Sequence, residues 1–131
     1  MEKQSIIEFL EDNNLTDIEE IEIDSQDEVI AIKFFYDFDK DEISAAKSYA
    51  SEETDYDEND TQWIATGIIP YLNDLAYDNV AEINEDLMEE FELISRFKSE
   101  DISTSDYTYQ KFYLVLTEDD SIDLEDVINN I

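Results

Sequence analysis

The apolar residues of this chain recur at two spacings, and each spacing permits one kind of secondary structure. Near the start, Ile6, Ile7 and Leu10 are spaced as on one face of a helix, which predicts a short amphipathic helix over 3–12. Elsewhere, apolar residues alternate with polar ones, which is the period of a strand. The chain therefore combines helices with strands that have an apolar face.

Two pairs of segments show the alternation of a strand. In the first pair, Ile21 and Ile23 alternate with acidic residues, and a second strand follows over 30–38 with its apolar residues on one face. The second pair covers 93–98 and 107–117, which are separated by a polar, turn-like segment. Strands joined by short connections pair antiparallel, so we expect two β-hairpins.

Further segments have apolar residues at helical spacing: 41–50, 63–75, 80–91 and 124–131. Gly67 and Pro70 are expected to bend or divide the second of these helices. Asn79 and Ser121 have the side chains of N-caps, and we expect them to start the last two. The prediction is a single α+β domain over 1–131, with two antiparallel β-hairpins in one small sheet and four to five helices packed on one face of it.

The acidic residues set this chain apart from an ordinary α+β domain. It has 38 Asp and Glu against 7 Lys and Arg, and a formal net charge of -31. Because 42% of the residues are hydrophobic and 12% are aromatic, the composition is that of a folded chain and not of a disordered acidic tail. Solubility alone needs a net charge of only about 2 to 8 in magnitude, so we infer that the charge serves recognition.

Duplex DNA is the natural comparison for this charge, because it carries about one negative charge per 1.7 Å of its axis. A compact chain of this length has a diameter of about 36 Å, and a duplex of that length carries about 20 charges. The protein thus equals or exceeds DNA in charge per unit length. A site that grips phosphates is expected to attract it.

Several classes of function are disfavoured by what the chain lacks. It has no His and no Cys, which removes the usual general base and the strongest nucleophile, and one Gly cannot build a phosphate-binding loop. We therefore expect no enzymatic activity and no cofactor. The first residues lack the pattern of a secretory signal, no apolar run is long enough to span a bilayer, and anionic lipids would repel the chain. We expect a cytoplasmic protein that does not bind membranes, in the host's cytoplasm if a phage encodes it.

Two acidic segments begin like calcium-binding EF-hand loops. Residues 37–41 have the pattern D-x-D-x-D, and residues 55–59 have the pattern D-x-D-x-N. Neither has the Gly required at the sixth position or the Glu required at the twelfth. Such matches are common in a chain this rich in acids, so we expect no specific metal site.

Three groups of carboxylates are the candidate partner-binding residues. On a helix, side chains at i and i+4 lie about 6 Å apart along the axis, and on a strand those at i and i+2 lie about 6.6 Å apart. Phosphates along one DNA strand have a comparable separation of about 6 to 7 Å, so rows of carboxylates could imitate rows of phosphates. The candidates are Glu82, Glu85, Asp86, Glu89 and Glu90 on a predicted helix, Glu52, Glu53, Asp55, Asp57, Glu58 and Asp60 in the acidic segment 51–60, and Glu20, Glu22 and Asp24 on the first predicted strand.

These features predict a non-catalytic inhibitor that occupies the phosphate-binding groove of a DNA- or RNA-binding protein. In size and composition the chain resembles the acidic DNA mimics that phages and mobile elements use against restriction or CRISPR systems; no family motif covers it, so the resemblance is one of functional class. The expected partner is a basic nucleic-acid-binding protein, not nucleic acid itself. Exposed tyrosines such as Tyr49, Tyr56 or Tyr107 are candidate anchors. The sequence leaves open whether the chain forms a homodimer.

Other functions would use the same charge. An immunity protein would neutralise one basic nuclease toxin and would add a hydrophobic hot spot to its acidic surface. An acidic chaperone would bind many basic proteins weakly and with strong dependence on salt. Adaptation to high salt would also give an acidic surface, without any dedicated partner.

Overall fold

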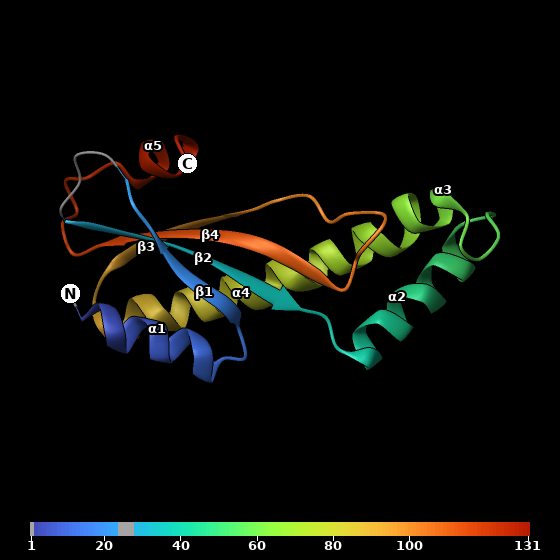
Figure 1. The fold of residues 1–131 in the computed structure, drawn as a ribbon, viewed down its shortest axis with the longest axis horizontal. Coiled ribbons are helices and arrows are strands. Elements are labelled where there is room, and N and C mark those ends of the chain that lie inside the picture. The colour runs from blue at the N-terminus through green and yellow to red at the C-terminus, as the bar shows by residue number, and fades with distance from the viewer. Residues whose placement is uncertain (1, 24–27) are drawn as a thin grey trace.

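The structure is an antiparallel sheet flanked by helices and extended at one end by a helical arm (Figure 1). It is a computed structural model that describes residues 2–23 and 28–131. The predicted α+β class with one antiparallel sheet is confirmed. In chain order the elements are α1 (Lys3–Asp12), β1 (Thr16–Ile21), β2 (Val29–Asp37), α2 (Lys40–Glu53), α3 (Thr61–Trp63), the π-helical turn η1 (Ile64–Ile68), α4 (Ile69–Phe91), β3 (Ile94–Ser99), β4 (Tyr109–Thr117) and α5 (Leu124–Asn129).

The four strands lie in the order β1-β2-β4-β3, and all neighbouring strands are antiparallel. β1 and β2 form the first predicted pair, and β3 and β4 form the second. The two pairs join along β2 and β4, whose register runs from Val29 opposite Thr117 to Asp37 opposite Tyr109. This pairing between distant parts of the sequence makes one continuous sheet.

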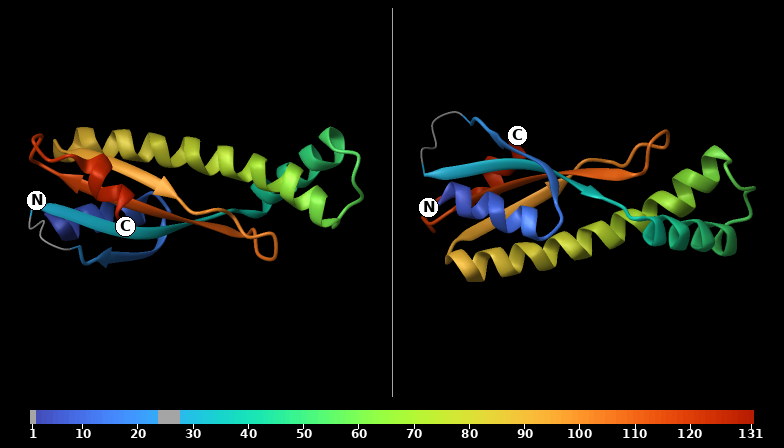
Figure 2. Two further views of the ribbon diagram at one scale, coloured as in Figure 1. Left: turned by 90° about the horizontal axis from the view of Figure 1, so that it is seen from above. Right: turned by 60° about the horizontal axis from the view of Figure 1, so that its bottom comes forward.

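Helices cover both faces of the sheet, so the expectation of helices on one face only is wrong (Figure 2). α1 and α4 pack on the face that includes Ile32 of β2. The opposite face also carries apolar residues, among them Val29 and Ala31, and α5 covers them with Leu124 and Ile128. A strand that is apolar on both sides needs a covering layer on each.

One long helix, α4, replaces the two helices expected on either side of Asn79. Asn79 lies in the middle of α4 and caps nothing; its side-chain amide donates a hydrogen bond of 2.7 Å to the hydroxyl of Tyr36. The predicted irregularity lies before α4, in the π-helical turn η1 that contains Gly67. Pro70 is the second residue of α4, which follows η1 directly; because the chain stays helical through this junction, the missing backbone N–H of Pro70 adds to the irregularity there.

α2, α3 and η1 form an arm that projects beyond the end of the sheet (Figure 1). Its two sides approach closely where Gly67 meets Ala50: a Cβ added at Gly67 would lie 2.5 Å from the Cβ of Ala50. Glycine is therefore required for this close approach. Trp63 is buried in the same core cluster as Ala50 and Ile68. The acidic loop over 54–60 closes the far end of the arm.

The end of β1 and the N-cap of α5 differ from those predicted. The alternation of Ile21 and Ile23 predicted a strand that includes both residues, but β1 ends at Ile21. α5 is capped by Asp123, whose carboxylate accepts a hydrogen bond of 3.3 Å from the backbone N–H of Asp126. Ser121 is not its N-cap, because the hydroxyl and backbone N–H of Ser121 both donate to Asp119.

Candidate functional site

The exposed side of α4 carries an unbroken row of carboxylates. Neighbours in the row are four residues apart, which is about 6 Å along the helix axis. All are exposed, and in the described part of the chain none of them pairs with Lys or Arg. We call this set the α4 acidic row: Asp74, Asp78, Glu82, Asp86 and Glu90. Sequence reasoning identified its last three members, and the same spacing also selects the two that were missed.

The rest of α4 adds to this charge. Glu85 and Glu89, the other predicted residues on this helix, are exposed beside the row. In total α4 contains seven carboxylates and no Lys or Arg. The nearest basic residues in the sequence are Lys47 and Arg96. The negative charge of α4 is therefore not neutralised from within the helix.

Several helices have acidic residues in their last turn, where the helix dipole disfavours a negative charge. The C-terminal end of a helix carries a partial negative charge, so an acid there costs about 0.3 to 1 kcal/mol at an exposed site. No helix among α1, α2 and α4 has a basic residue in its last turn. The acids at these ends are Glu11 and Asp12 in α1, Glu52 and Glu53 in α2, and Glu89 and Glu90 in α4. We infer that the acidic residues at these positions were not selected for the stability of the helices.

Two members of the row form one wall of a concave surface. Glu82 and Asp86 line a groove of about 580 Å³, together with Asp37, Asp39 and Glu42 from the end of β2 and the start of α2. We call it the acidic groove. Asp37 and Asp39 were considered above only as part of an incomplete calcium loop. No sequence pattern brings them to α4, because their position depends on how α2 and β2 pack against that helix.

Hydrogen bonds fix the residues of β2 and α2 that line the acidic groove opposite α4. Asp39 accepts from the backbone N–H of Glu42 at 2.8 Å, and Glu42 accepts from the backbone N–H of Asp39 at 2.9 Å, which is a capping box for α2. The second carboxylate oxygen of Glu42 accepts from the hydroxyl of Tyr36 at 2.8 Å. Since Asn79 of α4 also donates to this hydroxyl, the network links β2, α2 and α4.

Burial, together with the hydrogen bond to Glu42, raises the pKa of Tyr36 to about 12 from its ordinary value of 10.0. The unfolded chain releases this proton near the ordinary value, whereas the folded chain holds it to higher pH. The hydrogen-bonded tyrosine therefore stabilises the fold fully below pH 10, and this contribution is lost as pH rises from 10 towards 12.

The variant Y36F tests this link between the elements around the acidic groove. We expect it to be less stable than the native chain at about pH 9, and the difference in free energy of unfolding to shrink by about pH 11.5. Chemical denaturation at both pH values measures it. Y77F removes a hydroxyl from an exposed tyrosine and should change stability little at either pH. A Y36F difference that is constant with pH would contradict the assignment.

The predicted acidic segment over 51–60 lies at the far end of the helical arm (Figure 1). Asp60 has a structural role there, because its carboxylate caps α3 by accepting from the backbone N–H of Gln62 at 2.8 Å. The α4 acidic row begins close to the arm and continues away from it along α4. All six predicted carboxylates are exposed, and we call them the acidic tip: Glu52, Glu53, Asp55, Asp57, Glu58 and Asp60.

In the third predicted group, Glu20 and Glu22 do not lie on one strand. Glu20 lies in β1, and its carboxylate pairs with Lys3 at 2.7 Å. Glu22 is exposed but follows the end of β1, and Asp24 lies outside the described residues. The expected row of three carboxylates on one strand is wrong because β1 ends at Ile21.

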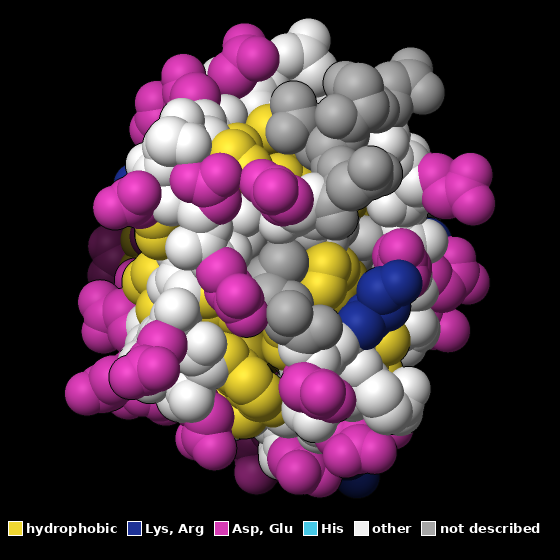
Figure 3. Space-filling view, turned by 90° about the vertical axis from the view of Figure 1, so that its left-hand side faces the viewer, with side chains coloured by type: hydrophobic (Ala, Val, Ile, Leu, Met, Phe, Trp, Pro, Cys, Tyr) yellow, Lys and Arg dark blue, Asp and Glu magenta, His cyan; other side chains and the backbone are white. Residues whose placement is uncertain are grey.

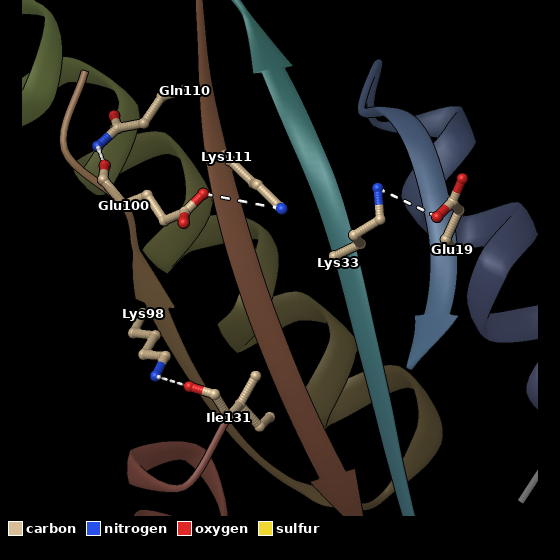
Figure 4. A network of polar contacts seen from close by, with 7 residues as sticks. All are labelled: Glu19, Lys33, Lys98, Glu100, Gln110, Lys111 and Ile131. Atoms are coloured by element: carbon tan, nitrogen blue, oxygen red, sulfur yellow. Dashed lines mark hydrogen bonds and ion pairs between the residues drawn. The ribbon is translucent and has the colours of Figure 1, made fainter. Parts of the chain in front are cut away.

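Basic residues gather on the sheet face opposite α1 and α4 (Figure 4). Lys33 pairs with Glu19 at 3.1 Å, and Lys111 pairs with Glu100 at 3.8 Å. Lys98 lies on the neighbouring strand, and all three ammonium groups lie 5.2 to 5.6 Å from the centre of an aromatic ring. These cations are engaged on the far side of the sheet from α4, so they do not neutralise the α4 acidic row.

Acidic side chains are not confined to α4. The space-filling view of the end near both chain termini has acidic side chains along its left, lower and right edges, with few Lys or Arg side chains between them (Figure 3). Charge alone therefore does not single out one face. α4 is distinguished by the regular spacing of its row and by the groove beside it.

Among the described residues, no three or more His, Cys, Asp or Glu side chains are grouped so as to hold a metal ion. In the same part of the chain, no helix combines the length and the apolar character needed to cross a membrane. Comparison with models of protein families, with curated proteins and with solved structures finds no match. The candidate site therefore rests on the geometry of α4 and of the residues around it.

Proposed function

We propose that this protein is a non-catalytic nucleic-acid mimic, which occupies the phosphate-binding groove of a basic DNA- or RNA-binding protein. The observation that carries this proposal is the α4 acidic row, which is regular, exposed and without cationic partners in the described chain. Its acids extend into the last turn of α4, where they work against the helix dipole. A surface selected for folding or solubility alone would not need this arrangement.

The dimensions of α4 support the proposal. From Asp74 to Glu90 the helix rises by about 24 Å, and one DNA strand carries about seven phosphates over the same length of duplex axis. α4 presents seven carboxylates over this span. The match concerns the number of charges per length, and the acidic groove adds three more carboxylates beside it.

The proposed mechanism is competition. Lys and Arg side chains that normally hold phosphates would pair with the carboxylates of α4, and an Arg can do so through two parallel hydrogen bonds. A net charge of -31 would also speed the encounter with a basic groove at low ionic strength. Within this class, an inhibitor of CRISPR or restriction enzymes acting in the cytoplasm fits best, because such enzymes depend on grooves that grip nucleic-acid backbones.

The proposal is tested by capture followed by competition. The tagged protein is used to bind partners from a bacterial lysate, treated with nuclease, at physiological salt. Duplex DNA, single-stranded DNA and RNA are then added to the washed complex. We expect a nucleic-acid-binding protein to be retained and then released by one of these ligands. Retention of a protein that none of them displaces would contradict mimicry.

A second candidate, an immunity protein for one nuclease toxin, is favoured by a specific observation. Tyr49 is 41% exposed and lines a groove beside α4, and such a tyrosine suits the hydrophobic hot spot of a dedicated partner. The capture experiment separates the two candidates. A single toxin bound through surfaces outside its nucleic-acid groove would favour the immunity protein.

A further inference from the structure

We propose that a groove between α2 and α4 binds the side chain of an arginine on the target protein. This inference rests on the proposed function, because it names one contact of the same interface. The groove has a volume of about 470 Å³, which is large enough for one long side chain. We call it the tyrosine groove, and its lining includes Tyr49, Pro70, Tyr71, Asp74, Leu75 and Asp78.

The tyrosine groove leaves apolar surface open to solvent. Tyr49 packs against Tyr71 with ring centroids 5.3 Å apart and ring planes tilted by 38°, yet 41% of Tyr49 stays exposed. Leu75 is only half-buried at the edge of the core. Of the other tyrosines that the sequence suggested as anchors, Tyr56 is exposed on the arm and Tyr107 is half-buried. Exposed tyrosines next to apolar side chains are typical of interface anchors.

The charge of the groove selects a cation. Asp74 and Asp78 lie one helical turn apart, are exposed, and have no Lys or Arg partner among the described residues. A positive group held between them would be attracted by both carboxylates. Phosphate groups and acidic peptides would be repelled, which excludes nucleic acid as the occupant.

Arginine fits this combination better than lysine. Its planar guanidinium stacks on an aromatic ring such as Tyr49 and also makes paired hydrogen bonds to a carboxylate such as Asp74. Its aliphatic stem would cover Leu75, whereas the compact ammonium of lysine gains less from stacking.

The tyrosine groove and the acidic groove are neighbours along α4. Asn79 lines both, and the α4 acidic row contributes Asp74 and Asp78 to the first and Glu82 and Asp86 to the second. A basic surface laid along α4 would therefore pass both grooves. The tyrosine groove is the part of this path that adds aromatic contact to charge.

The test is a titration of the isotope-labelled protein with a capped Gly-Arg-Gly peptide, followed by amide NMR signals at low salt. We expect the signals of Tyr49, Asp74 and Leu75 to move at lower peptide concentration than those of Glu89 and Glu90. The matched Gly-Lys-Gly peptide should bind the groove less well. Y49A should weaken arginine binding about three- to fivefold. Y56A, which truncates another exposed tyrosine, should not weaken it.

Equal shifts at all acidic surfaces, equal binding of both peptides, or unchanged affinity of Y49A would overturn the assignment. These outcomes differ from a failure of the proposed function. The captured partner could be displaced by nucleic acid while Y49A binds arginine as the native chain does. In that case the proposed mimicry is supported, and the assignment of the tyrosine groove to arginine is wrong. If no nucleic-acid-binding partner is captured, the peptide titration still decides whether the groove prefers arginine.

Discussion

Reversal of three charges in the α4 acidic row, in the variant E82K/D86K/E90K, is expected to weaken binding to the captured partner by at least about 100-fold. Each substitution removes an attraction and places a cation opposite the partner's own cations. All three residues are exposed, and in the described part of the chain none of them has an ion pair that the fold would lose. Lysine near the C-terminal end of α4 also suits the helix dipole, and thermal unfolding should stay the same or shift upward. Binding is measured by calorimetry or surface-based kinetics with the purified partner.

A control variant distinguishes the effect of the α4 acidic row on binding from the effect of the net charge. D101K/D120K/E125K changes the net charge by the same amount, at exposed positions that lie outside the α4 acidic row and outside the linings of the acidic groove and the tyrosine groove. We expect it to slow association modestly and to leave the complex much tighter than the variant of the row does. If both variants weaken binding equally, total charge and not the row determines recognition, and the assignment of α4 is wrong.

Substitution of Gly67 by alanine is expected to lower the free energy of unfolding by about 2 kcal/mol. The added Cβ would lie 2.5 Å from the Cβ of Ala50 and 2.8 Å from its Cα, so the two sides of the arm would have to separate. Alanine has the higher helix propensity, by about 1 kcal/mol, which offsets part of this cost. Chemical denaturation of G67A and the native chain measures the net effect.

T66A provides the matched control for this variant. Thr66 is an exposed neighbour in the same π-helical turn, where its hydroxyl donates only to the backbone carbonyl of Gln62. We expect a change of less than about 0.5 kcal/mol. A G67A protein as stable as the native chain, or more stable, would mean that propensity outweighs the contact with Ala50. The close packing of the arm described above would then be incorrect.

Local periodicity was sufficient for many of the secondary elements. The helix over 3–12 has the predicted boundaries, because its apolar positions define both its face and its length. β2 and β4 lie where alternation placed them. Asn79 misled because its preference for N-caps was overridden by a tertiary contact with Tyr36. Propensity for a cap describes the local chain only, and packing decided otherwise.

The part of the candidate site that lies on one helix was predictable from the sequence. The part that is brought together by tertiary packing was not. The i, i+4 spacing identified Glu82, Asp86 and Glu90, and it needed only to be extended to complete the row. The opposite wall of the acidic groove was not predictable, because Asp37 reaches α4 only through the packing of β2 and α2. The expected strand row failed at Glu22 for a similar reason: alternation of residues does not fix where pairing in a sheet ends.

Competition with the purified partner tests the central claim most directly. The affinity of the partner for fluorescently labelled nucleic acid is measured by anisotropy at increasing concentrations of this protein. We predict that the apparent Kd of the nucleic acid rises in proportion to the protein concentration without reaching a plateau, because only one of the two ligands occupies the groove. A rise that levels off, or no rise while the protein is bound, would mean that both bind together, and mimicry would be refuted.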